Sequence, residues 1–540
     1  METIEYQDVV SSYDLEKLPI SITTTEVNLT GSWKFFKPHF SEKISPCSAA
    51  CPSNINIPKY IFYLLKNDLN TAVNILRREN PFPATCGRVC PHFCQYSCNR
   101  GEYDGEIKIR EIEKFLGDFA LNIPYKKPSV KLNKKVAIIG GGPAGLSCAY
   151  FLALHGVNIT IFEKENFLGG LLIYGIPSYR LPKEIVKKEI DNILEIGNID
   201  VKLNYKLMES DIEKLKEEYD AIFVSTGLSK SNIPENIELD NKNVISGYEL
   251  LKKINLNNTK IDGKVAIIGG GNVAIDVARS VLRLGAEPII IYRRSIDEMP
   301  AFKDEVEEAI EENIKIIERR IVGKIILNEK LNLILKKVNK ITGNKVETSL
   351  EEESLEVDKL IIATGQLKEF EIGEDEKVFT GGDFKYGARS VTEAINSGKL
   401  NAFKILNKFK VENTFSYIED DDFLRSVKDY DKFEIIEFDK INLFYFPKKE
   451  PLKLEKIPAK ERIKNFNEIL VKPSLEEILN EAKRCFSCGV CNQCKTCWFT
   501  CPDICVSVTD SVEFDYDHCK GCGLCSAECP RGLIEMVEDK

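Results

Sequence analysis

Two stretches of this chain carry the same pattern, an apolar β-branched run that breaks into glycines and continues with small residues at helical spacing. In the first, the run over 136–139 predicts a buried parallel strand, and residues 146–155 predict a helix. Between them, Gly140 allows a tight turn, Gly142 lets the backbone approach a pyrophosphate, and Gly145 lets helix and strand pack closely. This order of elements predicts a dinucleotide site.

The end of the next strand favours that site over a chance glycine-rich turn. A second apolar run over 158–162 ends in Glu163, about 20 residues beyond the glycines, where a carboxylate binds a ribose hydroxyl. The N-terminus of the intervening helix would offer unpaired N–H groups to the phosphates.

The second stretch, over 264–279, repeats the strand, a glycine turn at Gly269 and Gly271, and the helix. The strand that follows leads into Arg293 and Arg294 rather than into an acid. Because a carboxylate repels a 2′-phosphate and guanidinium groups bind one through charge-assisted hydrogen bonds, this pair favours NADP over NAD. The alternative is a solvated basic face.

Two further strands end in Thr-Gly, over 221–227 and 358–365, and Gly382-Asp383 follows a short apolar run. An Asp at a strand end before a helix suits a flavin ribityl chain better than a simple helix cap. The second stretch would then be an insertion in the first domain. The sequence therefore predicts an α/β fold with two nested Rossmann-like dinucleotide-binding domains.

Length and charge narrow the class of protein. A chain of 540 residues exceeds one hydrophobic core, so roughly three to four domains are expected. A net charge of −10 gives no reason to expect nucleic acid or an anionic membrane as partner. No stretch approaches the ~20 apolar residues of a membrane span, and the acidic N-terminus lacks the basic and apolar regions of a signal peptide. We therefore expect a cytoplasmic protein.

The cysteines indicate metal rather than disulfides. Of the 18 cysteines, all but Cys148 fall within 47–98 and 485–529, at CxxC and CxxxC spacings. In a cytosolic protein such spacing is typical of metal sites. Zinc would fit thiolates, but iron–sulfur clusters explain an adjacent flavin domain better.

The C-terminal cysteines form the bacterial ferredoxin run twice, and in that run the fourth Cys ligates the other cluster. The spacing therefore predicts two [4Fe-4S] clusters. Cys505 is left over and is interpreted as a small buried residue. One cluster would be held by Cys491, Cys494, Cys497 and Cys529, and the other by Cys519, Cys522, Cys525 and Cys501.

The chain resembles the glutamate synthase small-subunit family in the two fingerprints and in GGLLIYGIPSYRLPK, GGGNVAIDVAR, YRRS…EMPAF and FTGGD. That family includes the N-terminal part of dihydropyrimidine dehydrogenase and the large subunit of NADH-dependent ferredoxin:NADP oxidoreductase. The resemblance covers roughly residues 40–410. It implies FAD at the first fingerprint, NAD(P)H at the second, and an N-terminal helical domain with two [4Fe-4S] clusters.

The fingerprints and the resemblance together give the expected cofactor contacts. They are Gly140, Gly142, Pro143, Ala144, Gly145, Glu163, Lys164, Gly170, Leu171, Tyr174, Ile176, Arg180, Leu181, Thr226, Gly227, Gly269, Gly271, Asn272, Val273, Ala274, Asp276, Arg293, Arg294, Thr364, Gly365, Gly382, Asp383, Ser390, Val391 and Ala394.

The chain departs from the family in one place. The family usually carries R-C-x-x-C just before P-C-x3-C-P, whereas here no cysteine precedes Pro46-Cys47, and an R-C-x-x-C with Cys485 and Cys488 stands near the other end. The alternatives are that this pair binds nothing or that the N-terminus holds one cluster. The resemblance implies one cluster held by Cys47, Cys98, Cys485 and Cys488, a second held by Cys51, Cys90, Cys94 and Glu113 (where the family can carry Gln), and Cys86 as a non-ligand.

The expected domains follow from these assignments. They are an N-terminal α-helical iron–sulfur domain with a leading arm (1–130), an FAD-binding domain in two parts (131–260 and 358–410), an NAD(P)H-binding domain (261–357), a linker or docking segment (411–480) and a ferredoxin-like α+β domain (481–540).

The function expected is electron transfer between NAD(P)H and ferredoxin or a partner oxidoreductase subunit, through FAD and about four clusters. This electron transfer could take the form of electron bifurcation within a larger complex. Alternatives are a glutamate synthase small (beta) subunit that feeds an amidotransferase partner, and an assembly scaffold with a vestigial NAD(P) site. Disulfide reduction is disfavoured, because neither nucleotide domain holds a CxxC pair.

Overall fold

The computed structural model describes residues 29–234, 237, 242–256, 259–327, 329–343, 345–411, 434–509 and 511–539. The expected arm and part of the expected linker lie outside these residues. The chain divides into two compact units, one comprising 1–43, 439–447 and 489–540, and the other 44–438 and 448–488.

The larger unit contains the sheet of the first fingerprint. Five parallel strands have the order β16-β5-β2-β3-β4. They are β2 (Lys135–Ile139), β3 (Asn158–Phe162), β4 (Ile199–Lys202), β5 (Ala221–Val224) and β16 (Val378–Thr380). Helix α8 (Pro143–Leu154) and helix α16 (Val391–Lys408) pack closely against each other, because a side chain at Gly398 would meet the Ala144 carbonyl at 2.1 Å.

The second fingerprint belongs to another five-stranded parallel sheet, in the order β10-β9-β8-β14-β7. Its strands are β7 (Val244–Ser246), β8 (Lys264–Ile268), β9 (Glu287–Ile291), β10 (Lys315–Ile317) and β14 (Lys359–Ile362). This sheet extends beyond the expected limits of 261–357 at both ends. The Thr-Gly strand ending occurs in both domains, so it does not tell which sheet β14 joins.

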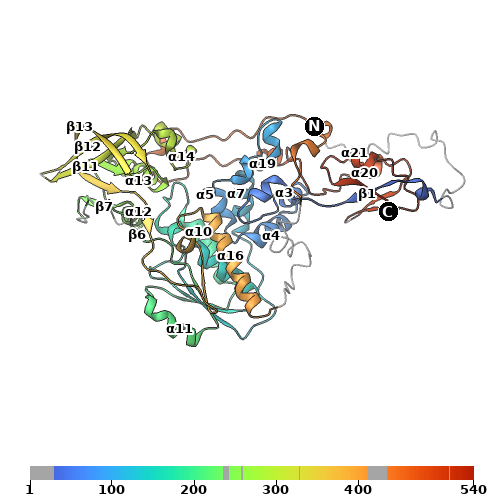
Figure 1. The fold of residues 1–540 in the computed structure, drawn as a ribbon, viewed down its shortest axis with the longest axis horizontal. Coiled ribbons are helices and arrows are strands. Elements are labelled where there is room, and N and C mark those ends of the chain that lie inside the picture. Colours follow the sequence, from blue (N-terminus) through green and yellow to red (C-terminus); the bar gives the residue numbers. More distant parts are fainter. Residues whose placement is uncertain are drawn as a thin grey trace. The chain divides into compact units, whose positions relative to one another are not determined.

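The two faces of this second sheet are covered differently (Figure 1). Helices α12 (Gly247–Asn255), α13 (Asn272–Arg283) and α14 (Lys303–Glu311) cover one face. An antiparallel sheet of β11 (Arg320–Leu327), β12 (Leu331–Thr342) and β13 (Lys345–Val357) packs on the other. On β12, Leu331, Leu333 and Leu335 are buried, which is the period-two pattern of a half-buried strand.

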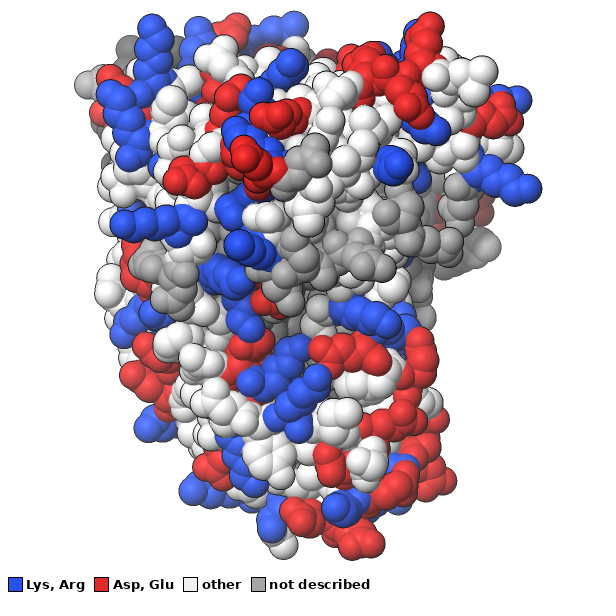
Figure 2. Space-filling view, turned by 90° about the vertical axis from the view of Figure 1, so that its left-hand side faces the viewer, with Lys and Arg blue, Asp and Glu red and all other residues white. Residues whose placement is uncertain are grey.

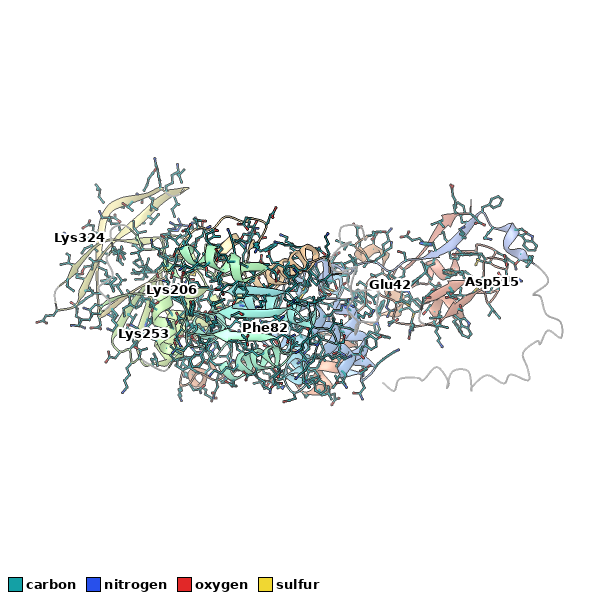
Figure 3. All side chains as sticks on the ribbon, turned by 90° about the horizontal axis from the view of Figure 1, so that it is seen from below. Glu42, Phe82, Lys206, Lys253, Lys324 and Asp515 are labelled. Atoms are coloured by element: carbon teal, nitrogen blue, oxygen red, sulfur yellow. The ribbon has the colours of Figure 1, made fainter. Side chains whose placement is uncertain are left out.

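Short helices form the N-terminal part of the larger unit. They are α2 (Pro46–Ala50), α3 (Ile57–Leu65), α4 (Leu69–Glu79), α5 (Pro83–Val89), α6 (Phe93–Tyr96) and α7 (Ile109–Ala120). Phe82, labelled in Figure 3, is fully buried in the same core as β2 and α8. The helical part and the first sheet therefore share a hydrophobic core.

The C-terminal segment 448–488 returns to this helical part. Helix α19 (Leu475–Ala482) packs on α3 and α7 and buries Ile478 and Ala482 in their core (Figure 1). Farther upstream, Arg462 donates hydrogen bonds to Glu312 (2.8 Å) and Glu311 (2.8 Å) of the second nucleotide domain. The segment thus contacts both the NAD(P) domain and the N-terminal helices.

The smaller unit has two two-stranded sheets. Strand β1 (Phe36–Phe40) pairs antiparallel with β19 (Ile534–Glu538), and β17 (Val506–Val508) pairs with β18 (Val512–Phe514). Two short helices, α20 (Thr496–Phe499) and α21 (Leu524–Ala527), complete it. Residues 29–43, expected to lead the N-terminal domain, therefore belong to the ferredoxin-like unit, because backbone pairing with a strand nearly 500 residues away leaves no local sequence signal.

Two surface features bear on possible partners. No helix among the described residues is long and apolar enough to cross a membrane. On the face shown in Figure 2, basic and acidic side chains are interspersed rather than gathered by sign.

Candidate functional site

The first fingerprint lines a pocket of about 120 Å³ at the carboxyl ends of the strands. Gly142 is the N-cap of helix α8, and Gly140 has φ +101°, a conformation that favours glycine. Gly145 does not line the pocket. A side chain there would meet the Gly140 carbonyl at 2.0 Å, so this glycine serves packing. The expected residues that line the pocket are Gly140, Gly142, Pro143, Ala144, Glu163, Lys164, Gly170, Leu171, Tyr174, Thr226, Gly227, Gly382, Asp383, Ser390, Val391 and Ala394.

Two carboxylates lie in this pocket on different strand ends. Glu163 accepts hydrogen bonds from the backbone N–H groups of Gly141 (2.8 Å) and Glu165 (3.0 Å), and burial raises the pKa of its carboxyl group. Asp383 follows Gly382, which has φ +60°, and burial raises the pKa of Asp383 to about 6. Both carboxylates can accept hydrogen bonds from ribose or ribityl hydroxyls.

A buried lysine holds the loop over this pocket. Lys183 donates hydrogen bonds to the carbonyl groups of Leu172 (2.8 Å) and Ile176. Burial lowers the pKa of Lys183 to about 7. The loop borders two spaces, since Leu171 lines the first pocket and Ile176 lines a neighbouring one.

That neighbouring cavity, of about 1090 Å³, contains the second fingerprint. A side chain at Gly271 would meet nothing within 4 Å, so the backbone faces open space there. Ala274 and Leu181, also expected as contacts, do not line either pocket and are buried. The expected residues that line the cavity are Ile176, Arg180, Gly269, Gly271, Asn272, Val273, Asp276, Arg293, Arg294, Thr364 and Gly365.

Arg180 and Asp276 were expected as separate contacts, but they pair with each other. The Arg180 guanidinium donates to both Asp276 carboxylate oxygens (2.9 and 2.8 Å) and forms an ion pair with Glu305. This pairing joins the loop over the first pocket to helix α13.

The pocket and the cavity share six lining residues, Leu171, Tyr248, Asp383, Arg389, Ser390 and Val391. Bound dinucleotides would therefore meet along one edge. No cysteine is among the described residues that line these two spaces.

Sequence reasoning missed many lining residues, among them Arg389, Tyr248 and Arg320. Arg389 directly precedes Ser390 at the start of α16, and this position was a usable signal. Tyr248 is the second residue of α12 and Arg320 begins β11. Tyr248 and Arg320 have no local sequence motif. The packing of elements that are distant in the sequence brings each of them to the cavity.

The smaller unit contains two small hollows lined by cysteines. The first contains Cys491, Cys494, Cys497 and Cys529. The second contains Cys501, Cys519, Cys522 and Cys525, with Cys505 as a fifth thiol. The exchange of fourth cysteines expected from the ferredoxin run is therefore present in the arrangement of the residues.

The N-terminal helices enclose a third small hollow, lined by Cys51, Cys90, Cys94 and Glu113. Burial raises the pKa of Glu113 to about 8, and Asn80 donates to its carboxyl oxygen (3.3 Å). Cys86 is buried nearby but does not line the hollow.

Cys47, Cys98, Cys485 and Cys488 come together in the larger unit. Burial raises the pKa of Cys47, and the neighbouring Cys98, Cys485 and Cys488 raise it further. Burial likewise raises the pKa of Cys488, with contributions from Cys485 and Cys98. The described chain thus brings together the four thiols that the resemblance assigns to one cluster.

The thiols suit clusters better than single ions. All 18 cysteines are free thiols. Within the described ranges, no three His, Cys, Asp or Glu side chains are close enough to hold a single metal ion. A [4Fe-4S] cluster takes one ligand at each of four irons, so its ligands surround a larger volume than those of zinc.

Neighbouring residues connect the dinucleotide spaces to the third hollow. Val391 lines both dinucleotide spaces, and the next residue, Thr392, lines the hollow. Val89 lines the large cavity, and the next residue, Cys90, lines the hollow. In each of these two segments, one residue lines a dinucleotide space and the next residue lines the hollow. The nucleotide region and this ligand set are therefore adjacent.

Comparison with known families agrees with each of these regions. Residues 134–366 match the pyridine nucleotide-disulphide oxidoreductase family, residues 42–124 match dihydropyrimidine dehydrogenase domain II with a 4Fe-4S cluster, and residues 512–535 match a 4Fe-4S binding domain. These matches imply FAD, NAD(P) and [4Fe-4S] clusters as cofactors.

Three curated proteins illustrate the relationship. The chain is 32% identical over 507 residues to the NADP(+)-dependent formate dehydrogenase subunit beta of Moorella thermoacetica, covering 82% of this chain and 70% of that protein. It is 36% identical over 297 residues to the NADPH-Fe(3+) oxidoreductase subunit beta of Geobacter sulfurreducens (53% and 44%). It is 32% identical over 378 residues to the NAD-dependent dihydropyrimidine dehydrogenase subunit PreT of Escherichia coli O157:H7 (66% and 89%).

These relatives are subunits of electron-transferring oxidoreductases, which supports the main hypothesis over a glutamate synthase subunit. The expected resemblance is confirmed in its flavin, nucleotide and iron–sulfur parts. The chain belongs to the family of NAD(P)H-dependent flavin and iron–sulfur oxidoreductase subunits that includes these proteins.

Proposed function

We propose that this chain moves electrons between NADPH and a partner oxidoreductase subunit or ferredoxin, by way of FAD and four [4Fe-4S] clusters. Bound FAD would supply the conversion between two-electron hydride transfer and one-electron transfer. The chain binds and orients the two dinucleotides and holds a cluster ligand set next to the edge where they meet.

The observation that carries the proposal is the pair of one-residue steps from the dinucleotide spaces to the third hollow. Val391-Thr392 and Val89-Cys90 lie on different elements. Two separate segments therefore place the third hollow next to the dinucleotide spaces. Electrons leaving the flavin would reach the cluster of Cys51, Cys90, Cys94 and Glu113 first.

The preference for NADPH rests on Arg293 and Arg294. Both line the large cavity after β9, where a nucleotide ribose would lie. A basic pair there attracts a 2′-phosphate. The formate dehydrogenase relative is named for NADP, which supports this proposal, whereas the PreT relative is named for NAD. The argument for NADPH therefore rests on Arg293 and Arg294 of this chain.

The partner and the location are proposed on chemical grounds. The relatives are named as subunits, which supports assembly into a hetero-oligomer. A cytoplasmic location is favoured because thiol ligands for clusters persist in reducing compartments. Bifurcation stays a hypothesis without a residue to argue from.

The test measures two half-reactions anaerobically with a Cys90→Ser variant. Flavin bleaching by NADPH reports hydride transfer, and NADPH formation from reduced viologen and NADP reports electron entry through the clusters. We expect Cys90→Ser to slow the viologen reaction by roughly tenfold or more while flavin bleaching is unchanged.

The matched control is Cys86→Ser, a buried thiol on helix α5, which Cys90 caps, and Cys86 does not line the hollow. It should preserve both reactions. Equal viologen rates in Cys90→Ser and the wild type would contradict electron transfer through this cluster.

A further inference from the structure

The phenol of Tyr60 is buried beside the ligand set nearest the flavin. Tyr60 lies on α3, is 1% exposed, and lines the hollow formed with Cys51, Cys90, Cys94 and Glu113. Its hydroxyl group has no hydrogen-bond partner among the described residues. Leaving a buried hydroxyl unpaired is unfavourable, so an acceptor in the hollow would stabilise it.

The groups around Tyr60 show which acceptor is close. Its phenol interacts electrostatically with Glu113 and Cys94, and also with Cys47 and Cys51. Cys94 and Cys51 belong to the ligand set of the hollow, and Cys47 belongs to the neighbouring set. The phenol is therefore close to thiols of both N-terminal ligand sets.

The other lining side chains are Glu113, which would itself be a ligand of the cluster, a proline, three apolar residues and Thr392. Ile55, Ile57 and Phe93, which also line it, are apolar. Thr392 directs its hydroxyl toward the Cys86 sulfur (3.9 Å). The sulfur atoms of a cluster held in this hollow would be the acceptors in front of the phenol.

We propose that the Tyr60 hydroxyl donates a hydrogen bond to a sulfur of the cluster held by Cys51, Cys90, Cys94 and Glu113, and so raises its reduction potential. A hydrogen bond to cluster sulfur stabilises the reduced state, which carries one more negative charge. The proposal rests on the proposed function, since it needs this cluster. Its consequence is that the first acceptor after the flavin is easier to reduce.

The variant Tyr60→Phe removes the hydroxyl and keeps the ring. Iron content is measured first in the full chain, so loss of the cluster is seen separately from a change in its potential. Glu113→Gln then identifies the EPR signal of this cluster, because one ligand changes from carboxylate to amide. A redox titration followed by EPR gives the potential of that signal.

We expect Tyr60→Phe to keep all its iron while the ratio of reduced to oxidised cluster at a fixed potential falls roughly tenfold, which is about 59 mV for one electron. An exchangeable-proton coupling seen by ENDOR in the wild type should also disappear. Tyr63→Phe, one turn along the same helix and outside the hollow, should change neither.

One outcome would contradict the proposed function and a different outcome would contradict the Tyr60 hydrogen bond. A wild type without iron in this hollow would overturn the proposed function itself. A full iron complement with the same potential and the same proton coupling in Tyr60→Phe would overturn the hydrogen bond alone, leaving Tyr60 as a packing residue.

Discussion

Gly142 and Gly271 occupy matching positions in the two fingerprints, and both face open space. A side chain at Gly142 would meet only the Gly170 Cα, at 4.0 Å, and one at Gly271 would meet nothing within 4 Å. Neither glycine has a φ in the left-handed region. Their role is therefore close approach to a ligand, which separates them from packing glycines such as Gly145.

Replacing Gly142 with Val should give a folded protein that lacks FAD, because the side chain would enter the pocket where the pyrophosphate binds. Gly271→Val should keep FAD but weaken NADPH binding. Flavin absorbance per chain and NADPH titration measure the two effects. A Gly142→Val protein with full flavin content would show that the first fingerprint is not the FAD site.

Removing the basic pair, as Arg293→Ala with Arg294→Ala, should weaken NADPH binding much more than NADH binding. Each lost charge-assisted hydrogen bond is worth about 1.5–3 kcal/mol. The comparison of kcat/KM for the two cofactors measures the effect. The assignment fails if the wild type uses both with equal kcat/KM.

Asp383 should make the flavin-free protein sensitive to pH. Its folded-state pKa, about 6, lies above the ordinary value of 3.8, so the protonated form is favoured in the folded state. The resulting stabilisation is complete below pH ~4 and is lost as the pH rises through about 6. Relative to the wild type, Asp383→Asn should therefore gain roughly 2–3 kcal/mol between these values. Thermal unfolding across pH measures it, and a constant difference would contradict the burial of this carboxyl group.

At the scale of elements, the local patterns predicted most strands and helices but not their partners. Strand β2, the glycine turn and α8 follow from a short apolar run and three glycines. Strand β14 was assigned to the wrong sheet, because its Thr-Gly ending is also used by β5. Strand β1 was not foreseen, since only distant pairing with β19 defines it. Pairing across long separations leaves no trace in local sequence.

The segment 448–488 is the element that sequence analysis described least. Residues 448–480 were expected as part of a linker or docking segment and residues 481–488 as part of the ferredoxin-like domain, yet all belong to the larger unit. Arg462 is buried against Glu312, which Arg279 and Arg283 also contact. The segment is held by a buried ion-pair network among three separate elements, and residue spacing in the sequence does not reveal such a network.

Removing this anchor by Arg462→Met should loosen the segment without loss of flavin or iron. The lost charged hydrogen bonds are worth about 1.5–3 kcal/mol, and Glu312 keeps its other two arginines. Hydrogen exchange of the Ile457 and Val471 amides, which bond to Ile469 and Glu455, should speed up by roughly tenfold or more.

The control for that experiment is Lys472→Met. Lys472 pairs with Asp118 at 3.0 Å, but its side chain is 60% exposed, so little change is expected. Equal exchange in both variants would show that Arg462 does not hold the segment.

At the scale of the whole molecule, cysteines from distant parts of the sequence come together. Cys485 and Cys488 lie near the C-terminal end, and they come together with Cys47 and Cys98 inside the larger unit. The family resemblance implied this set, while the ferredoxin run could be assigned from its spacing alone. Whether a cluster occupies each ligand set stays a prediction.

A truncation after Cys488 should remove the two ferredoxin clusters and leave the larger unit with its cofactors. The unit boundary falls between Cys488 and Gly489. We expect a loss of about eight irons per chain, at four per cluster, with FAD retained. A loss near four would indicate a single cluster in the C-terminal run.

The central claim, that the C-terminal pair completes an N-terminal cluster, is tested most directly by the iron content of Cys485→Ser with Cys488→Ser. The account predicts about sixteen irons per chain in the wild type and about twelve in this variant, with FAD retained. Cys86→Ser with Cys148→Ser, two buried non-ligand thiols, should keep about sixteen. If the Cys485 and Cys488 variant kept all its iron, the two ends of the chain would not share a cluster.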